Sequence, residues 1–142
     1  MSETRLLIVD DHPLFRRGVR QLVEMDPDMV IAGEAANGAE AVEAAGTLDL
    51  DLILMDLNMA RMDGLEALRQ MRSNGIDTRI VMLTVSDADD DVVAALRAGA
   101  DGYLLKDMEP EDLLDRIKEA AEGKLVISPQ LAAILAGIVS GG

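Results

Sequence analysis

Short apolar runs and amphipathic helical segments alternate five times along this chain, and no other feature constrains its fold as strongly. The apolar runs cover residues 5–9, 29–33, 50–55, 79–84 and 102–105. The segments after them repeat apolar residues at helical spacing and extend to about residues 25, 46, 72, 98 and 122. This alternation predicts an α/β fold, a doubly wound parallel sheet of five strands with helices on both faces.

The composition agrees with one domain that has an aliphatic core. The chain has 142 residues, 49% of them hydrophobic, with one Phe, one Tyr and no Trp. This length is enough for one packed domain. Because the sequence contains no Cys, disulfides and thiolate metal sites are excluded.

The net charge and the hydropathy pattern argue against two kinds of partner, nucleic acids and membranes. A formal net charge of −14 argues against nucleic-acid binding by this chain itself, because such modules are normally basic. No apolar run reaches the roughly 18 residues of a membrane span. The first residues, MSETR, are polar and unlike a signal peptide. We therefore expect a cytoplasmic protein without a membrane partner.

A sixth helical pattern follows the fifth strand–helix unit. Ser128 is expected to cap it and Pro129 to occupy its first turn. The pattern carries an apolar stripe: Leu131, Ile134, Leu135 and Ile138. Two interpretations stay open, namely a helix that docks on its own domain and a linker cut short before a further domain. We expect a domain at residues 1–124, followed by a linker and truncated helix at residues 125–142.

Polar residues end four of the predicted strands. Asp10 and Asp11 follow the first strand, Asp56 the third, Thr84 the fourth and Lys106 the fifth. In doubly wound sheets ligands bind outside the carboxyl ends of the strands, and neighbouring strands lie about 4.8 Å apart. If these strands are neighbours, the five side chains converge on one pocket.

Three carboxylates in one pocket need a cation. Oxygen ligands favour Mg²⁺, or Mn²⁺ in its place, which takes one or two carboxylates, a carbonyl and a phosphate oxygen. A carboxylate can also act as a nucleophile and form an aspartyl-phosphate, with a lysine and a hydroxyl holding the remaining phosphate oxygens. We interpret the single histidine, His12, as structural or as acting through another ligand. The acids at residues 87–91 are interpreted as a solvated helix start.

These motifs resemble the receiver domain of bacterial two-component response regulators. The resemblance runs in order from Arg5 to Gly123 and rests on VDDHP, LMDLNM with MDG, MLTVS and YLLKD. The stretches DDHPLFRRGV and GADGYLLKD further resemble nitrate/nitrite-type regulators of the LuxR/FixJ type. The resemblance implies a flavodoxin-like (βα)5 sheet with strand order 2-1-3-4-5. It also implies a signalling switch that catalyses only its own phosphorylation and dephosphorylation.

The resemblance assigns a role to each residue that would handle the phosphoryl group. Asp56 would accept it, Lys106 would pair with it, and Thr84 would move to bond it. Tyr103 matches an aromatic switch position, although a half-buried strand aromatic is an equally good interpretation.

The resemblance also implies the metal ligands. Asp10 or Asp11, together with Asp56 and the backbone carbonyl of Asn58, would hold Mg²⁺. Because successive residues of an extended chain point to opposite sides, we expect Asp11 to be the direct ligand and Asp10 to act through water.

The partners implied by the resemblance are a sensor histidine kinase or a small phosphodonor such as acetyl phosphate. Phosphorylation would alter dimerisation or release a helix-turn-helix DNA-binding domain that lies outside this chain. One departure from the family is the loop after Asp56, where Ala60 and Arg61 stand in place of the usual Pro. Losing the fixed φ of Pro predicts a looser loop with retained chemistry.

Three other functions fit parts of the pattern. A haloacid-dehalogenase-type phosphatase would carry its nucleophile on the first strand in a DxD motif, whereas Asp56 follows the third strand and precedes Asn58 by two positions. A flavin-binding module would need a Ser/Thr/Gly-rich phosphate loop where the carboxylates of DDHPLF stand. A phosphorylation-independent pseudo-receiver is disfavoured by the presence of Asp56, Thr84 and Lys106.

Overall fold

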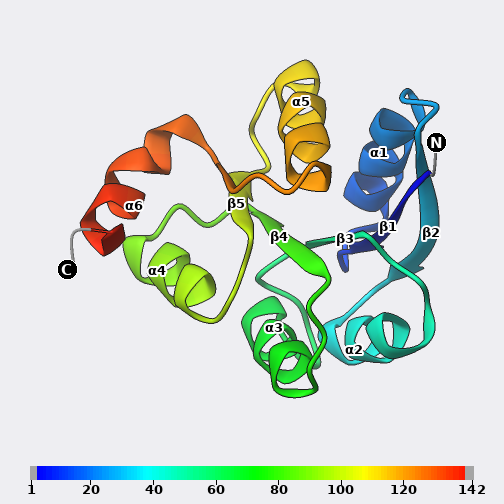
Figure 1. Ribbon diagram of the computed structural model, residues 1–142, viewed down its shortest axis with the longest axis horizontal. Helices are drawn as coiled ribbons and strands as arrows, with labels where there is room; N and C mark the ends of the chain where they lie inside the picture. Colours follow the sequence, from blue (N-terminus) through cyan, green and yellow to red (C-terminus); the bar gives the residue numbers. More distant parts are fainter. Residues whose placement is uncertain (1–2, 140–142) are drawn as a thin grey trace.

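The computed structural model describes residues 3–139, which fold into a parallel sheet covered by helices on both faces (Figure 1). The strands follow the spatial order β2-β1-β3-β4-β5-β6. Their bounds are β1 (Thr4–Val9), β2 (Met29–Ala35), β3 (Leu52–Met55), β4 (Arg79–Thr84), β5 (Gly102–Leu105) and β6 (Val126–Ile127). The helices are α1 (Pro13–Glu24), α2 (Gly38–Thr47), α3 (Gly64–Ser73), α4 (Asp89–Arg97), α5 (Pro110–Ala121) and α6 (Ala132–Val139), with a 3₁₀ turn at Pro129–Leu131.

Alternate residues of the strands build two apolar cores, one on each face of the sheet. Leu6 and Ile8 of β1 pack with α1 and α5, whereas Leu7 and Val9 pack with α2, α3 and α4. Figure 1 shows the same division, with α1 and α5 on one side of the sheet and α2, α3 and α4 on the other. Strands buried on both faces read as continuous apolar runs, which is why the sequence pattern identified them.

The predicted α/β class and the order of the first five strands are confirmed, but the expected number of strands is wrong. A sixth strand, β6, pairs in parallel with β5 through Gly102 with Val126 and Tyr103 with Ile127. Two residues are too few to display an alternation of apolar and polar side chains. The pairing therefore depends on tertiary contacts rather than on local sequence.

Ser128 occupies the N-cap position of the 3₁₀ turn and Pro129 its first turn, as expected, but the Ser128 side chain makes no capping hydrogen bond. The fully buried hydroxyl instead accepts a hydrogen bond from the Leu105 amide at 2.9 Å and donates to the Met108 sulfur at 3.3 Å. The Ser128 amide donates to the Tyr103 carbonyl at 3.1 Å. Ser128 thus prolongs the pairing of β6 with β5 up to the residue before Lys106.

The C-terminal helix docks on its own domain, as one of the two interpretations expected. Leu131 is buried in the core on the α4 side of the sheet, and Ile134 packs against that core. Figure 1 shows α6 beside α4. The Ile138 side chain and residues 140–142 lie outside the described part. Among residues 3–139, no helix has the length and apolar character needed to cross a bilayer.

We expect Ser128→Ala to lower the free energy of unfolding by about 1–3 kcal/mol, because the substitution leaves the buried Leu105 amide without its acceptor. Urea unfolding followed by far-ultraviolet circular dichroism measures the change. The matched control is Ser73→Ala at the exposed end of α3, which should change stability by less than about 0.5 kcal/mol. Equal stabilities of the two variants would contradict the assignment.

Candidate functional site

The three charged groups predicted to converge do so at the carboxyl edge of the sheet. The Lys106 ammonium lies 2.7 Å from Asp10 Oδ2 and 3.0 Å from Asp56 Oδ2. Asp10 and Asp56 are only 2% and 3% exposed. Buried carboxylates of like charge repel each other and are costly to desolvate, so the shared lysine is what makes their proximity tolerable.

Backbone pairing holds each of these residues in place one position beyond its strand. The Asp10 amide donates to Ala35 at 3.0 Å, the Asp56 amide to Val9 at 2.9 Å and the Lys106 amide to Thr84 at 2.9 Å. Each amide therefore still belongs to the ladder with a neighbouring strand. The side chains start from fixed points, and this rigidity allows the site to be organised in advance of any ligand.

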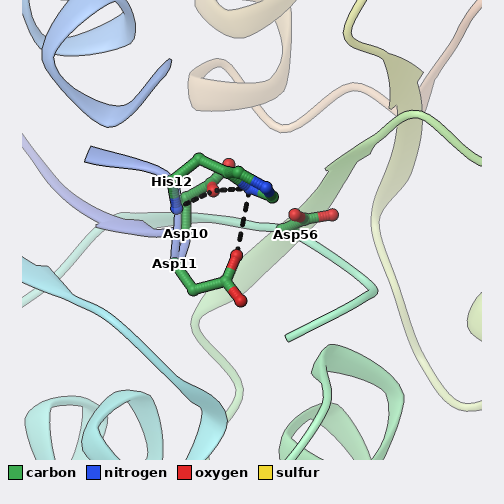
Figure 2. A group of neighbouring side chains, drawn as sticks. All are labelled: Asp10, Asp11, His12 and Asp56. Atoms are coloured by element: carbon green, nitrogen blue, oxygen red, sulfur yellow. Dashed lines mark hydrogen bonds and ion pairs between the residues drawn. The ribbon is translucent and has the colours of Figure 1, made fainter. Parts of the chain in front are cut away.

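Asp11 and His12 complete the acidic cluster (Figure 2). His12 Nδ1 lies 3.2 Å from Asp10 Oδ1 and 3.0 Å from Asp11 Oδ1. Asp11 Oδ1 is buried yet accepts no hydrogen bond of good geometry from the described residues. Figure 2 shows the His12 ring linked to both carboxylates, with Asp56 facing them from β3.

The cluster has the donors that a hard divalent cation prefers. Asp10, Asp11, His12 and Asp56 each offer a ligand atom, and these atoms all lie within 4.8 Å of one another. Three of the four donors are carboxylate oxygens, which suit Mg²⁺ and Mn²⁺. Asp11 Oδ1 has His12 Nδ1 3.0 Å away but accepts no hydrogen bond of good geometry from the described residues, so this buried acceptor would gain from a cation.

The loop between β3 and α3 packs against these acids through its backbone. The Asn58 amide points to Asp56 Oδ1 and the Ala60 amide to Asp11 Oδ2, both at 3.4 Å. Arg61 has a φ of 61°, in the left-handed region that costs a residue with a side chain. The expectation of a looser loop stays a prediction, as does the role of the Asn58 carbonyl as a ligand.

Two glycines bring the same loop close to the strand ends. The Gly38 amide donates to the Met62 carbonyl and the Gly64 amide to the Leu57 carbonyl, both at 2.8 Å. A Cβ built on Gly64 would lie 2.1 Å from the carbonyl oxygen of Asp56. Gly64 belongs to the MDG motif. Apart from this glycine, nothing in the sequence indicates that the loop backbone lies so close to Asp56.

Thr84 ends β4, the strand between β3 and β5, and Tyr103 lies in β5; both side chains are fully buried. The Tyr103 hydroxyl donates to the Ser86 carbonyl at 2.9 Å, and the Ser86 amide points to Thr84 Oγ1 at 3.4 Å. Tyr103 is a strand aromatic, as one interpretation expected, but it is fully buried rather than half-buried. Burial raises the pKa of Tyr103 to about 12, and Asp91 nearby acts in the same direction.

One neighbour of the site was not anticipated from the sequence. The Lys106 ammonium lies over the ring of Phe15, 4.3 Å from its centroid. Phe15 belongs to the apolar stripe of α1, and that pattern indicates a core position rather than a contact with a charge. Asp10, Asp11, Asp56, Thr84 and Lys106 are otherwise brought to one edge of the sheet, as predicted.

The family of the chain follows from the comparison with known proteins. Residues 6–118 match the model of the response regulator receiver domain. This stretch covers most of the chain and includes Asp10, Asp11, Asp56, Thr84 and Lys106. The chain therefore belongs to the response regulator receiver domain family, and the expected family is confirmed.

Among curated proteins, the chain is similar to two nitrate/nitrite regulators of Escherichia coli. It is 53% identical to the nitrate/nitrite response regulator protein NarL over 92% of this chain and 61% of that protein. It is also 53% identical to the nitrate/nitrite response regulator protein NarP over 89% of this chain and 59% of that protein. The chain thus spans about three fifths of the length of these relatives.

Solved structures of the same family share the fold. A two-component response regulator of the LuxR family from Aurantimonas superposes with a TM-score of 0.89 at 32% identity, over 98% of this chain and 99% of that one. A NarL receiver domain from Mycobacterium tuberculosis gives a TM-score of 0.83 at 33% identity, over 87% of this chain and all of that one. The chain is a receiver domain of the LuxR-family response regulators.

We expect Gly64→Ala to destabilise the protein by about 1–3 kcal/mol, because the added methyl group cannot fit against the Asp56 carbonyl. Urea unfolding measures the change. The matched control is Gly18→Ala in α1, where a Cβ meets nothing within 4 Å and should stabilise the helix by about 0.5–1 kcal/mol. If Gly64→Ala is as stable as Gly18→Ala, the loop can move to accommodate the methyl group, and the close approach to the Asp56 carbonyl does not constrain residue 64.

The chain has a single Tyr and no Trp, so tyrosinate absorbance reports Tyr103 alone. We expect a titration midpoint near 12 rather than the value of about 10 for an exposed tyrosine. Because the pKa of Tyr103 is raised on folding, its contribution to stability is complete below about pH 10 and falls as the pH rises towards 12. In Tyr103→Phe this part of the alkaline loss should vanish. A midpoint near 10 in the folded protein would contradict the burial described here.

Proposed function

We propose that Asp56 accepts a phosphoryl group from the phosphohistidine of a sensor histidine kinase or from a small donor such as acetyl phosphate. The observation that carries the proposal is the buried Asp56 carboxylate held 3.0 Å from the Lys106 ammonium and beside Asp10. An Asp56 oxygen attacks phosphorus, and the bond from phosphorus to the imidazole nitrogen or the acetate oxygen breaks. The electron pair of that bond leaves with the imidazole or the acetate.

The charges around Asp56 support this reaction. Phosphoryl transfer depends on positioning and on neutralising the charge of the transferred group, and it needs little acid–base chemistry. The Lys106 ammonium already lies beside Asp56. Once Asp56 is phosphorylated, the flexible lysine side chain can pair with the phosphoryl oxygens instead. The assignment of Asp56 as acceptor and Lys106 as its partner agrees with the chain's membership of the receiver family.

Asp10, Asp11, Asp56 and the backbone carbonyl of Asn58 would hold Mg²⁺, or Mn²⁺ in its place. When bound, the cation would neutralise phosphoryl oxygens during transfer. The Asp10 oxygens already face Lys106 and the His12 amide, the latter at 2.8 Å. Asp11 Oδ1 lies 3.0 Å from His12 Nδ1 but accepts no hydrogen bond of good geometry from the described residues. This difference supports Asp11 as the direct ligand and Asp10 as the one that acts through water.

Thr84 and Tyr103 would convert phosphorylation into a change of shape. The phosphoryl group adds about −1.5 to −2 units of charge beside Thr84, by analogy with other phosphorylated side chains. Among the described residues, Thr84 Oγ1 takes part in only a long contact with the Ser86 amide at 3.4 Å, so turning towards a phosphoryl oxygen costs little. Movement of Thr84 would disturb the Ser86 backbone that Tyr103 binds.

The output would lie outside the described residues. NarL and NarP extend beyond the matched region, which supports a division into a receiver at residues 1–124 and a linker from residue 125. Phosphorylation would then alter dimerisation or release a helix-turn-helix domain that binds DNA. The chain would act in the cytoplasm as a signalling switch, catalysing only its own phosphorylation and dephosphorylation.

Incubation with acetyl phosphate and Mg²⁺, followed by intact mass measurement, tests the proposal. We expect one phosphoryl adduct on the wild-type chain and none on Asp56→Asn. Removing Mg²⁺ with a chelator should abolish the adduct. Lys106→Met should slow its formation by about 100-fold, since one charge-stabilising donor is lost. An adduct that persists in Asp56→Asn would place the acceptor elsewhere.

A further inference from the structure

We propose that Phe15 is a positioning residue for Lys106. Its ring holds the ammonium in line with Asp10 and Asp56 and thereby sets the rate of phosphoryl transfer. This inference rests on the proposed function of Asp56 as acceptor. It adds a residue from α1 that neither the strand-end motifs nor the acidic cluster includes.

The contacts of the ammonium are the first argument. Lys106 Nζ has three hydrogens, and two carboxylate oxygens lie 2.7 and 3.0 Å from it. The ring of Phe15 is its only other charge-stabilising partner among residues 3–139, with the centroid 4.3 Å away. The lysine side chain is only 10% exposed, so water cannot readily replace the ring. A desolvated ammonium over an aromatic face is stabilised more than an exposed one.

The position of Phe15 in the chain is the second argument. Phe15 lies in the first turn of α1, directly after the segment that carries Asp10 and Asp11. Val19 and Val23, one and two turns later, are buried in the core and fix the rotation of the helix. The ring is therefore set by the packing of α1 and not by its contact with the lysine. A group placed by an independent structure can orient its neighbour.

The space around the ring is the third argument. A groove of about 260 Å³ lies between α1 and α5, and both Phe15 and Lys106 line it. Leu22, Met108 and Leu113 form other parts of its apolar wall. The Phe15 ring therefore occupies space through which water in the groove would otherwise approach the ammonium. With a much smaller side chain, water in the groove would reach Nζ and compete with the carboxylates for its hydrogens.

The chemistry distinguishes an aromatic ring from an aliphatic side chain of similar size. Leucine keeps this part of the groove wall apolar, but it has no π face to attract a cation. Tyrosine keeps the π face and differs from phenylalanine only by a hydroxyl group. Phe15→Leu and Phe15→Tyr therefore separate cation binding from packing.

The test compares these two variants with the wild type and with Leu22→Ala, which removes apolar contact from the same groove without touching Lys106. Rates of Asp56 phosphorylation are measured over a range of acetyl phosphate concentrations at saturating Mg²⁺. We expect Phe15→Leu to lower the second-order rate constant roughly 2- to 10-fold. Phe15→Tyr should restore it to within about 2-fold of the wild type, and Leu22→Ala should leave it unchanged even though it lowers stability.

A spectroscopic measurement reports the contact directly. Protons above the face of an aromatic ring resonate upfield, so the ε-methylene protons of Lys106 should be shifted upfield in a ¹H–¹³C spectrum of the wild type. The signal is assigned by its loss in Lys106→Met. The upfield shift should persist in Phe15→Tyr and in Leu22→Ala and disappear in Phe15→Leu.

The outcomes separate this inference from the proposed function. If the wild type forms no adduct, the proposed function fails while the upfield shift can still show the contact. If the wild type is phosphorylated and Phe15→Leu reacts at the wild-type rate, the positioning role is wrong and the acceptor stands. Equal slowing by Phe15→Leu and Leu22→Ala, or failure of Phe15→Tyr to restore the rate, would reduce Phe15 to a packing residue.

Discussion

The site depends on one buried ion-pair cluster, in which the Lys106 ammonium faces the carboxylates of Asp10 and Asp56. Removing one partner of a buried ion pair typically costs about 3–5 kcal/mol, because an uncompensated charge remains. The two acids can therefore lie side by side only as long as the lysine stays between them. A new anionic group on Asp56 would change the balance of charge at the carboxyl edge of the sheet, where the chain leaves β1, β3 and β5.

The order of the strands explains why these particular side chains are needed. Asp10 and Asp56 follow β1 and β3, which are neighbours, whereas Lys106 follows β5 on the other side of β4. Two strand spacings amount to about 10 Å, a gap that only a long side chain can cross. Thr84 ends the strand in between. A short hydroxyl there leaves room for the lysine to pass and still presents a polar atom to the same pocket.

The sequence predicted the parts of the structure that repeat and missed those that occur once. Five strand–helix units were recognisable because each carries an apolar pattern of its own, and Asp56 and Lys106 were found because they end such strands. β6 was missed because Val126–Ile127 is too short for a pattern. The contact of Phe15 with Lys106 and the buried hydroxyl of Ser128 were missed for another reason. Both join segments about 20 to 90 positions apart, and neither partner is unusual for its own segment.

These two unpredicted contacts both constrain Lys106, one at its side chain and one at the backbone next to it. Phe15 lies against its ammonium, and Ser128 binds the amide of Leu105, the residue before it. Ser128 is also the residue from which the chain turns into α6, whose neighbour is α4. Displacing Lys106 along its side chain therefore disturbs α1, whereas displacing its backbone disturbs the segment that leads to α6. A change of charge at Asp56 that displaces Lys106 would therefore disturb two elements. One is α1, through Phe15, and the other is the segment leading to α6, through Ser128.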